Sequence, residues 1–590
     1  MRKRFLNGCW ILIASTLTLA AGSNDGSLIQ AVKDGDQAAV KTLMQRKADV
    51  NAAEADGSTA LLWAAYANDV ATVDLLLKAG ANVKATNKFG VSPLALAAEA
   101  GSVSLVERFL KAGADPNLSY SSSGGGETVL MTAARTGAAD LVRLLLSSGA
   151  DVNGREPTRG QTALMWAAAG GHTAAVRVLI EGGADVKARS SEMKASHENK
   201  YVFGRKDAAS GEKLPMFTPL MFTALHGHID AARALLDAGA NVNDAAPDGT
   251  PILHVAIINA NWEYAARLLE WGADPKVESA GGTALHHIAH VRATKVLVKT
   301  GGIPPPVGRG SMSSLELAKR LVAGGADPNT RITKPGEKIY GTRAGTRSGM
   351  TALMLATMPA DPDYVRTLLA LGADPKLKTN NRTTVLMMAA GLELNSLLGD
   401  DEEALEILRI MVDRGLDVND QNDVGDAALH GAAFRDSNAV IEFLVSKGAK
   451  LDVANSIGWT PLMEAAWTGR GLFNTRPGAE KLFRSLYEKN GLPILVPTRD
   501  EAIEKLVDSK GGPVISCPEA LTVKASGQTG AVINYAEATA TSRRRYGKLE
   551  TKCTPPTGST FPLGNTIVTC TATDENKRSD SCTLIMKVEQ

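Results

Sequence analysis

Residues 57–84 read GSTALLWAAYANDVATVDLLLKAGANVK, and residues 90–117 read GVSPLALAAEAGSVSLVERFLKAGADPN. Both stretches open on Gly with Ser or Thr two residues later and pass through a run of Leu and Ala. Near their ends both have Gly followed by Ala and then Asn or Asp. The second copy begins 33 residues after the first, and further copies begin at Gly160 and Gly458. A fixed period of this size predicts a helical repeat array, which presents a long surface and no single enclosed pocket.

The bulk composition limits the classes of protein that need to be considered. A chain of 590 residues is too long for one compact core, so we expect several domains or a repeat array. Lys and Arg number 64 against 63 Asp and Glu, which leaves a formal net charge of +1. This balance gives no reason to expect a nucleic-acid partner.

The first residues have the pattern of a secretory signal. The basic sequence MRKR precedes the apolar run Trp10–Ala20, and the small residues of Ala20–Ser23 follow it. This order predicts a cleaved signal peptide over residues 1–22. The run is short for a membrane span, and no later stretch is apolar enough to be one. We therefore expect a secreted or periplasmic protein of bacterial type.

The cysteines point to the same compartment. Cys9 lies in the predicted signal, and the other four gather near the C-terminal end at Cys517, Cys553, Cys570 and Cys582. An even number of cysteines in a small region of an exported chain predicts a disulfide framework. Three pairings are compatible with the sequence.

Each repeat is predicted to form two helices. Thr59 can cap the first helix, and in a sister unit Ser92 is followed by Pro93, a residue favoured in the first helical position. The second helix of the first unit places apolar residues at Val73, Leu76 and Leu77. Gly80 then ends that helix, and the Asp- and Asn-rich segment beyond it is expected to form a hairpin-like finger.

These units resemble ankyrin repeats, whose pattern is roughly DGxTPLHxAAxxGHxxVVxLLLxxGADVN. The resemblance implies a mainly α fold, an ankyrin-repeat solenoid of helix-turn-helix units with β-hairpin fingers. We expect about twelve units over residues 23–490. The repeat spacing lengthens at four places, which predicts insertions near 187–215, 299–312, 330–349 and 390–403. Such insertions map to loops, often on the binding face.

The pattern changes after the array. Residues 491–512 are expected to hold a closing helix and a linker. Short alternating runs then predict a small all-β sandwich over residues 513–590. The sequence CTPPTGSTFPLGNTIVTCTATD from Cys553 resembles the hyalin-repeat (HYR) domain, which implies an Ig-like fold found in extracellular proteins. The segment Ser542–Arg545 departs from that family's pattern.

The sequence predicts no catalytic, cofactor-binding or metal-binding residues. His286 and His290 are four residues apart on a predicted helix, as in a metal pair. However, His286 occupies the slot in which ankyrin units place a His that hydrogen-bonds within the array, as do His254 and His430. No HExxH, GxSxG, GxxxxGK or GxGxxG motif is present.

A row of residues near the ends of the first helices is the predicted binding surface. In ankyrin arrays this register faces the concave surface, and exposed aromatic and Arg side chains there suit a protein interface. The register two to four residues earlier, with Trp63, Trp166 and Phe222, is expected to pack between units. The predicted partner-binding residues are Tyr66, Glu99, Arg135, His226, Asn259, His290, Phe434, Arg435 and Trp467.

Together these features predict an extracytoplasmic scaffold that is not an enzyme. The array would bind a protein partner through its fingers and concave face, and the C-terminal domain would serve adhesion or display. We expect a monomer without a cofactor. Two alternatives remain open: an enzyme whose site is built by the insertions, and a structural cell-surface protein whose array is a spacer.

Overall fold

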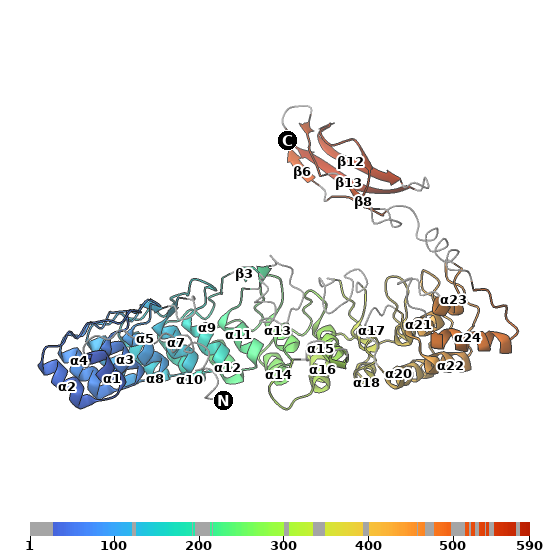
Figure 1. Ribbon diagram of the computed structural model, residues 1–590. Coiled ribbons are helices and arrows are strands. Elements are labelled where there is room, and N and C mark those ends of the chain that lie inside the picture. The colour runs from blue at the N-terminus through green and yellow to red at the C-terminus, as the bar shows by residue number, and fades with distance from the viewer. Residues whose placement is uncertain are drawn as a thin grey trace. The chain divides into compact units, whose positions relative to one another are not determined.

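The computed structural model places most of the chain in a helical repeat fold followed by a small β domain (Figure 1). It describes residues 27–120, 126–191, 193–194, 213–214, 216–299, 306–333, 349–392, 400–456, 458–466, 477–496, 514–518, 521–525, 530–536, 538–541, 548–573 and 579–590. The predicted signal peptide and most of the predicted closing helix lie outside these residues, as do parts of the four insertions. The described chain divides into two compact units, one formed by 1–287 with 306–325 and the other by 288–305 with 326–590.

Unit 1 is built from consecutive helix pairs, with α15 (Ala284–Lys299) beginning in this unit and ending in unit 2. The helices of unit 1 are α1 (Leu28–Lys33), α2 (Gln37–Gln45), α3 (Ala60–Tyr66), α4 (Val70–Lys78), α5 (Pro93–Glu99), α6 (Val103–Lys111), α7 (Val129–Thr136), α8 (Ala139–Ser147), α9 (Ala163–Gly170), α10 (Thr173–Glu181), α11 (Pro219–His226), α12 (Ile229–Asp237), α13 (Ile252–Ile258), α14 (Trp262–Glu270) and α16 (Ser314–Ala323). The first helix of each pair is called the inner helix below, and the second the outer helix.

The helices begin where the sequence predicts. The Thr59 hydroxyl accepts a hydrogen bond from the N–H of Leu62, and the Ser92 hydroxyl accepts one from Ala95 at 3.1 Å. Each bond satisfies a backbone donor that has no partner inside the helix. Pro93 follows Ser92 in the first turn of α5, where its missing N–H costs nothing.

Several inner helices end at a glycine with a left-handed backbone, which the following tight turn requires. Gly137 ends α7 with φ 76°, and Gly171 ends α9 with φ 68°. A side chain at Gly171 would also collide with His228, because a Cβ there would lie 2.1 Å from Nδ1 of that ring. Backbone conformation and close packing therefore both favour glycine here.

Packing between neighbouring pairs forms the core of unit 1. The inner helices α3, α5, α7, α9, α11 and α13 contact one another in chain order, and the outer helices α4, α6 and α8 do likewise. On α3, Leu61, Ala64 and Ala65 are buried, and on α4 Val73 and Leu76 are buried. Burial of each large aliphatic side chain contributes about 2 kcal/mol, and one isolated pair could not achieve it.

Unit 2 repeats this arrangement. Its helices are α17 (Ala352–Thr357), α18 (Pro362–Ala370), α19 (Val385–Ala390), α20 (Asp401–Asp413), α21 (Ala428–Arg435), α22 (Asn438–Ser446), α23 (Pro461–Ala466) and α24 (Pro477–Lys489). The inner helices α17, α19, α21 and α23 contact in order, as do the outer helices α18, α20, α22 and α24. Thus the predicted repeat pattern continues through this unit.

Two short hairpins occur in unit 1. Strand β1 (Ser119–Tyr120) pairs antiparallel with β2 (Glu127–Thr128), directly before α7. Strand β3 (Met193–Lys194) pairs antiparallel with β4 (Lys213–Leu214), within the predicted insertion at 187–215. Met193 and Lys194 of that insertion are thus paired with Leu214 and Lys213 near its other end.

The remaining strands form the C-terminal β domain. They are β5 (Val514–Ser516), β6 (Leu521–Lys524), β7 (Ala531–Val532), β8 (Thr539–Thr541), β9 (Lys548–Leu549), β10 (Thr551–Thr554), β11 (Thr560–Phe561), β12 (Gly564–Thr573) and β13 (Ser579–Glu589). One sheet has the order β10-β12-β13-β6, a second has β5-β8-β9, and β7 pairs with β11. Phe561, Val568 and Met586 are fully buried between these strands, so the domain has its own core.

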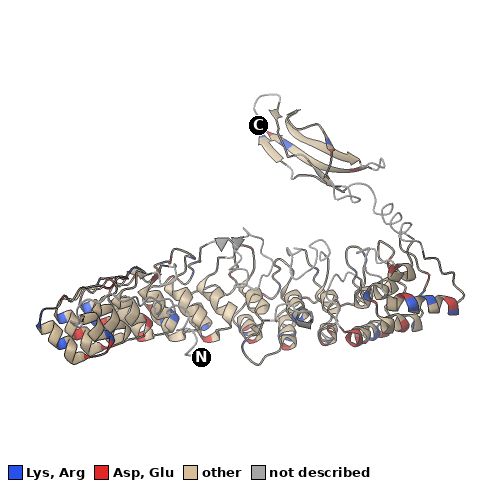
Figure 2. Ribbon diagram, viewed as in Figure 1, with Lys and Arg blue, Asp and Glu red and all other residues tan. Residues whose placement is uncertain are grey.

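No helix among the described residues is both long enough and apolar enough to cross a bilayer. Lys and Arg residues are interspersed with Asp and Glu residues along the helices of each unit (Figure 2).

Candidate functional site

Four of the predicted binding residues lie exposed in the last turns of inner helices of unit 1. They are Tyr66 on α3, Glu99 on α5, Arg135 on α7 and His226 on α11. Tyr66 is 49% exposed, a large fraction for an aromatic ring in a packed array. These side chains provide an aromatic, an acidic and two basic contact points on a rigid helical scaffold.

The ring of Tyr66 packs against the ring of a second aromatic residue, Trp63. The Trp63 and Tyr66 rings meet edge to face with centroids 6.0 Å apart. The indole N–H of Trp63 donates to Oε2 of Glu54 at 2.8 Å, and the ammonium of Lys33 lies 4.3 Å from the indole centre. Trp63 is half-buried and fixed from two sides, so it limits the freedom of Tyr66.

Arg135 lies beside the turn that joins two units. Its Nε is 3.9 Å from Oε2 of Glu127, and its carbonyl oxygen is 2.9 Å from Nε2 of His172. The guanidinium is 42% exposed. A surface ion pair at this distance contributes little to stability, so the cation of Arg135 is available to a partner.

The predicted exposure is wrong for His290 and Arg435. His290 is only 8% exposed and Arg435 only 7%. Arg435 follows Phe434, and one residue turns the side chain about 100° around the helix; its Nε then donates to Oδ1 of Asp401 at 2.8 Å.

The remaining residues of the predicted row are less informative. Asn259 is half-buried, and its side-chain amide donates to the carbonyl of Val255 at 2.8 Å within the same helix region. Phe434 is half-buried. Trp467 lies outside the described residues. Of the register predicted to pack between units, Phe222 is buried, whereas Trp63 and Trp166 are half-buried.

Most of the histidine cluster forms hydrogen bonds within the array. Nδ1 of His286 accepts from the backbone N–H of Thr283 at 3.1 Å. The Ser279 hydroxyl lies 2.7 Å from Nδ1 of His254 and 3.1 Å from Nε2 of His287, and the two rings contact each other at a tilt, with centroids 4.5 Å apart. Burial lowers the pKa of His287 to about 3. The hydrogen bonds predicted for this slot are therefore present.

No group of three or more His, Cys, Asp or Glu side chains suited to a metal ion occurs in the part of the chain that the structure describes.

A ladder of asparagines between the fingers was missed by the sequence analysis. Asn153 donates from its side chain to the carbonyl of Gly183 at 3.2 Å, and its side-chain oxygen accepts from the N–H of Asp185 at 2.8 Å. The last residue of the GADVN phrase was the available signal. The other asparagines that bridge two units in this way are Asn51, Asn117, Asn243, Asn329 and Asn419.

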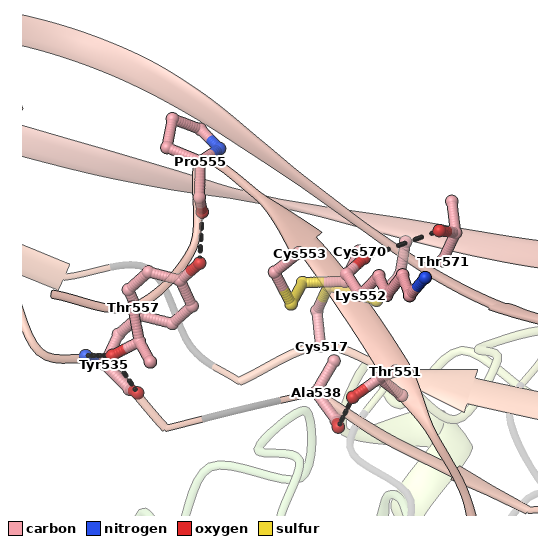
Figure 3. Close-up of a disulfide and its surroundings, with 11 residues drawn as sticks. Cys517, Tyr535, Ala538, Thr551, Lys552, Cys553, Pro555, Thr557, Cys570 and Thr571 are labelled. Atoms are coloured by element: carbon pink, nitrogen blue, oxygen red, sulfur yellow. Dashed lines mark hydrogen bonds between the residues drawn. A yellow bond between two sulfur atoms is a disulfide. The ribbon is translucent and has the colours of Figure 1, made fainter. Parts of the chain in front are cut away.

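All four cysteines predicted to form disulfides do so (Figure 3). Cys517 pairs with Cys582, and Cys553 pairs with Cys570. Figure 3 also shows the hydroxyl of Tyr535 donating a hydrogen bond to the carbonyl oxygen of Pro555. The disulfides tie the residue after β5 to β13 and tie β10 to β12.

Comparison with protein families agrees with this architecture. A model of three ankyrin repeats matches residues 28–120, 105–190, 202–279 and 398–475, and a model of one ankyrin repeat matches 348–380. The HYR domain model matches residues 507–588.

Curated relatives share the array only in part. The chain is 28% identical over 267 residues to the E3 ubiquitin-protein ligase KEG of Arabidopsis thaliana, which covers 40% of this chain and 15% of that protein. It is 32% identical over 283 residues to human ankyrin repeat and SOCS box protein 16, covering 48% and 54%. A putative ankyrin repeat-containing protein of Treponema pallidum is 32% identical over 156 residues, covering 26% and 41%. The matched regions thus span between 15% and 54% of these relatives.

Among solved structures, the human ASB11 ankyrin repeat domain matches at 24% identity with a TM-score of 0.31, over 39% of this chain and 90% of that one. The family models cover more than half of the sequence, and the stacked helix pairs follow the same repeat. The chain therefore belongs to the ankyrin-repeat family and carries an HYR domain over residues 507–588.

Proposed function

We propose that this chain is an extracytoplasmic scaffold that binds a protein partner through the inner-helix surface and fingers of its ankyrin array. The observation that carries the proposal is the exposed row of Tyr66, Glu99, Arg135 and His226 on the inner helices α3, α5, α7 and α11 of unit 1. Ankyrin repeats imply binding of a protein partner, and this fold is typically a non-catalytic scaffold.

The row has the chemistry of an interface hot spot. Aromatic and Arg side chains supply most of the binding energy at many protein interfaces. Tyr66 is held by Trp63 before any partner arrives, and Phe89 at a finger tip is 57% exposed. A preorganised side chain loses little entropy on binding, so more of its contact energy is available for affinity.

The HYR domain and its two disulfides are consistent with an extracellular location. We propose that this domain serves adhesion or display, and that an N-terminal signal over residues 1–22 directs export. The ligase names of some relatives do not extend to this chain, because the match to KEG covers 15% of that protein. We propose a binding role without catalysis.

Capture of a partner from envelope or culture-medium extract, with the full chain as bait, tests this function. The variant Tyr66→Ala with Arg135→Glu is expected to lose the captured protein. The control Arg233→Glu changes an exposed outer-helix residue that is paired with Asp237, and it is expected to retain the partner. Equal capture by all three proteins would contradict the proposal.

A truncated chain tests the alternative in which the array is only a spacer. A chain without residues 513–590 is expected to capture the same partner, because the proposed contacts lie in the array. Loss of capture in that truncated chain, with the array still folded, would favour a spacer that presents the HYR domain.

A further inference from the structure

A short segment after α15 folds back over the turn between α13 and α14. Its sequence is Gly308–Arg309–Gly310, and the N–H of Arg309 donates to the side-chain oxygen of Asn261 at 3.2 Å. A Cβ at Gly308 would lie 1.7 Å from the carbonyl oxygen of Ala260, and one at Gly310 would lie 2.2 Å from Oε2 of Glu263. Glycine on each side of Arg309 allows the segment to lie this close to Ala260 and Glu263. These contacts hold the backbone of Arg309 in place.

The segment continues a row of hydrogen bonds between units. Nε2 of His228 lies 3.0 Å from the carbonyl oxygen of Ala169, and the side chain of Asn261 donates to the carbonyl of Ala224 at 3.0 Å. In both cases a turn residue reaches back to the end of the preceding inner helix. The backbone N–H of Arg309 adds a hydrogen bond to the side chain of Asn261, and the side chain of Arg309 stays exposed.

Arg309 acts electrostatically on two neighbouring histidines. The rings of His226 and His228 are 6.1 Å apart. Desolvation, followed by the charge of Arg309, lowers the pKa of His226. The same two causes, in that order, contribute most to lowering the pKa of His228 to about 4, and His226 and His172 add to the effect. The charges that act on the two rings are therefore all basic groups.

The guanidinium of Arg309 has no ion pair with the carboxylates of the described residues. Glu263 packs against Gly310 without forming such a pair. Some surface cations of the described residues are matched, for example Arg267 with Glu270 at 2.7 Å and Arg233 with Asp237 at 2.8 Å, and others are not. What sets Arg309 apart is its place: it is held against the turn that carries His226 and His228, where a Cβ on Gly227 would lie 3.4 Å from Cβ of Arg309.

We infer that Arg309 and His226, next to the ring of His228, form an anion-binding site that takes a carboxylate of an acidic segment of the partner protein. The planar guanidinium suits a carboxylate because it can donate two parallel hydrogen bonds. The exposed ring of His226 can donate a further hydrogen bond to the carboxylate. A bound anion also offsets the charge of Arg309, which otherwise disfavours protonation of His226. That the ligand belongs to a partner protein rests on the proposed function. That an anion binds here is argued from the contacts of Arg309 described above.

A direct test uses the full chain and a fluorescein-labelled hexaglutamate peptide, with hexaglutamine as the uncharged probe. Fluorescence anisotropy should show binding of hexaglutamate and none of hexaglutamine. The variant Arg309→Gln keeps the backbone bond to Asn261 and is expected to weaken the affinity about tenfold. The matched control Arg267→Gln removes one positive charge from a paired site and is expected to leave the affinity unchanged.

Proton NMR of the histidine rings supplies a second measurement. The pKa of His226, assigned through His226→Gln, should rise when hexaglutamate is added to the wild type and remain unchanged in Arg309→Gln. Inorganic phosphate at the same charge concentration shows whether any small anion suffices; stronger binding of phosphate than of hexaglutamate would overturn the assignment to a carboxylate.

The outcomes separate this site from the proposed function. Hexaglutamate binding that depends on Arg309, together with failed partner capture, would uphold the site and reject the scaffold role. Partner capture that depends on Tyr66 and Arg135, with equal hexaglutamate binding by wild type and Arg309→Gln, would reject the site alone. Absence of hexaglutamate binding to the wild type would also overturn it.

Discussion

Arg435, the last residue of α21, donates from Nε to Oδ1 of Asp401 in the first turn of α20 at 2.8 Å. The two side chains differ in burial, since the arginine is 2% exposed and the aspartate 49%. Oδ2 of the same carboxylate accepts from the hydroxyl of Ser437 at 2.7 Å. The pair therefore joins an inner helix to the outer helix of the preceding pair and neutralises a cation inside the array.

This difference in burial predicts unequal effects of two substitutions. Asp401→Ala leaves a buried guanidinium without its counter-ion and is expected to lower the free energy of unfolding by about 2 kcal/mol. Arg435→Met removes the buried charge and leaves a carboxylate that water can reach, so its cost should be under half of that. Urea unfolding followed by circular dichroism measures both. A larger loss for Arg435→Met would contradict the argument.

The repeat architecture was predictable because it rests on periodic signals. Thr59, Ser92 and Pro93 mark helix starts, and Gly80 and Gly137 mark helix ends, whatever the rest of the chain does. The longer strands of the β domain were predictable for the same reason. The short strands β8, β9 and β11 have two or three residues each, too few to show an alternating pattern.

The binding surface was predictable only in part, because exposure at a helix end depends on the neighbouring elements that cover it. Arg135 is exposed, whereas Arg435, one position further from its helix N-cap, is buried and paired with Asp401 of α20. The placement of Arg309 was not predictable, because the segment that carries it follows no repeat. Its position depends on contacts with Ala260, Asn261 and Glu263 that only the fold reveals.

The asparagine ladder predicts one loss and one gain of stability. Asn153→Ala removes two bridging hydrogen bonds at an exposed position and should lower the free energy of unfolding by about 1–2 kcal/mol. Lys84 occupies the equivalent place two residues after Asn82, where its N–H donates to the Asn82 side chain. Lys84→Asn should therefore gain a bridge to the next finger and about 0.5–1 kcal/mol. Thermal melting measures both, and a destabilised Lys84→Asn would contradict the equivalence.

The buried histidines predict acid sensitivity of unit 1. Burial is the main cause that lowers the pKa of His254 and that of His287 from 6.5, so the unfolded chain binds more protons than the folded one below that pH. The contribution of each histidine is complete above about pH 6.5 and falls as the pH drops below that value. For His287 the loss continues toward pH 3, at up to about 1.4 kcal/mol per pH unit.

Two variants compare a buried histidine with an exposed one. His287→Leu changes a buried position whose counterpart in another unit is Leu96, and His226→Gln changes an exposed histidine. The first should flatten the dependence of stability on pH between about 4 and 6.5 strongly, whereas the second should flatten it less, because the lowering of the pKa is larger for the buried His287 than for His226. Urea midpoints across that range provide the measurement, and identical slopes in His287→Leu and wild type would count against the role of His287.

The two disulfides should differ in their effect on the β domain. Cys517 and Cys582 are 65 residues apart, whereas Cys553 and Cys570 are 17 apart and already face each other in the β10–β12 ladder. Closing the longer loop removes more unfolded-chain entropy, about 4 kcal/mol against about 3 kcal/mol. Replacing Cys517 and Cys582 with Ser should thus accelerate hydrogen exchange in β12 and β13 more than replacing Cys553 and Cys570. Mass spectrometry of residues 564–589 reads out this exchange, and the reverse order would mean that the strand ladder, and not loop closure, sets the stability of the domain.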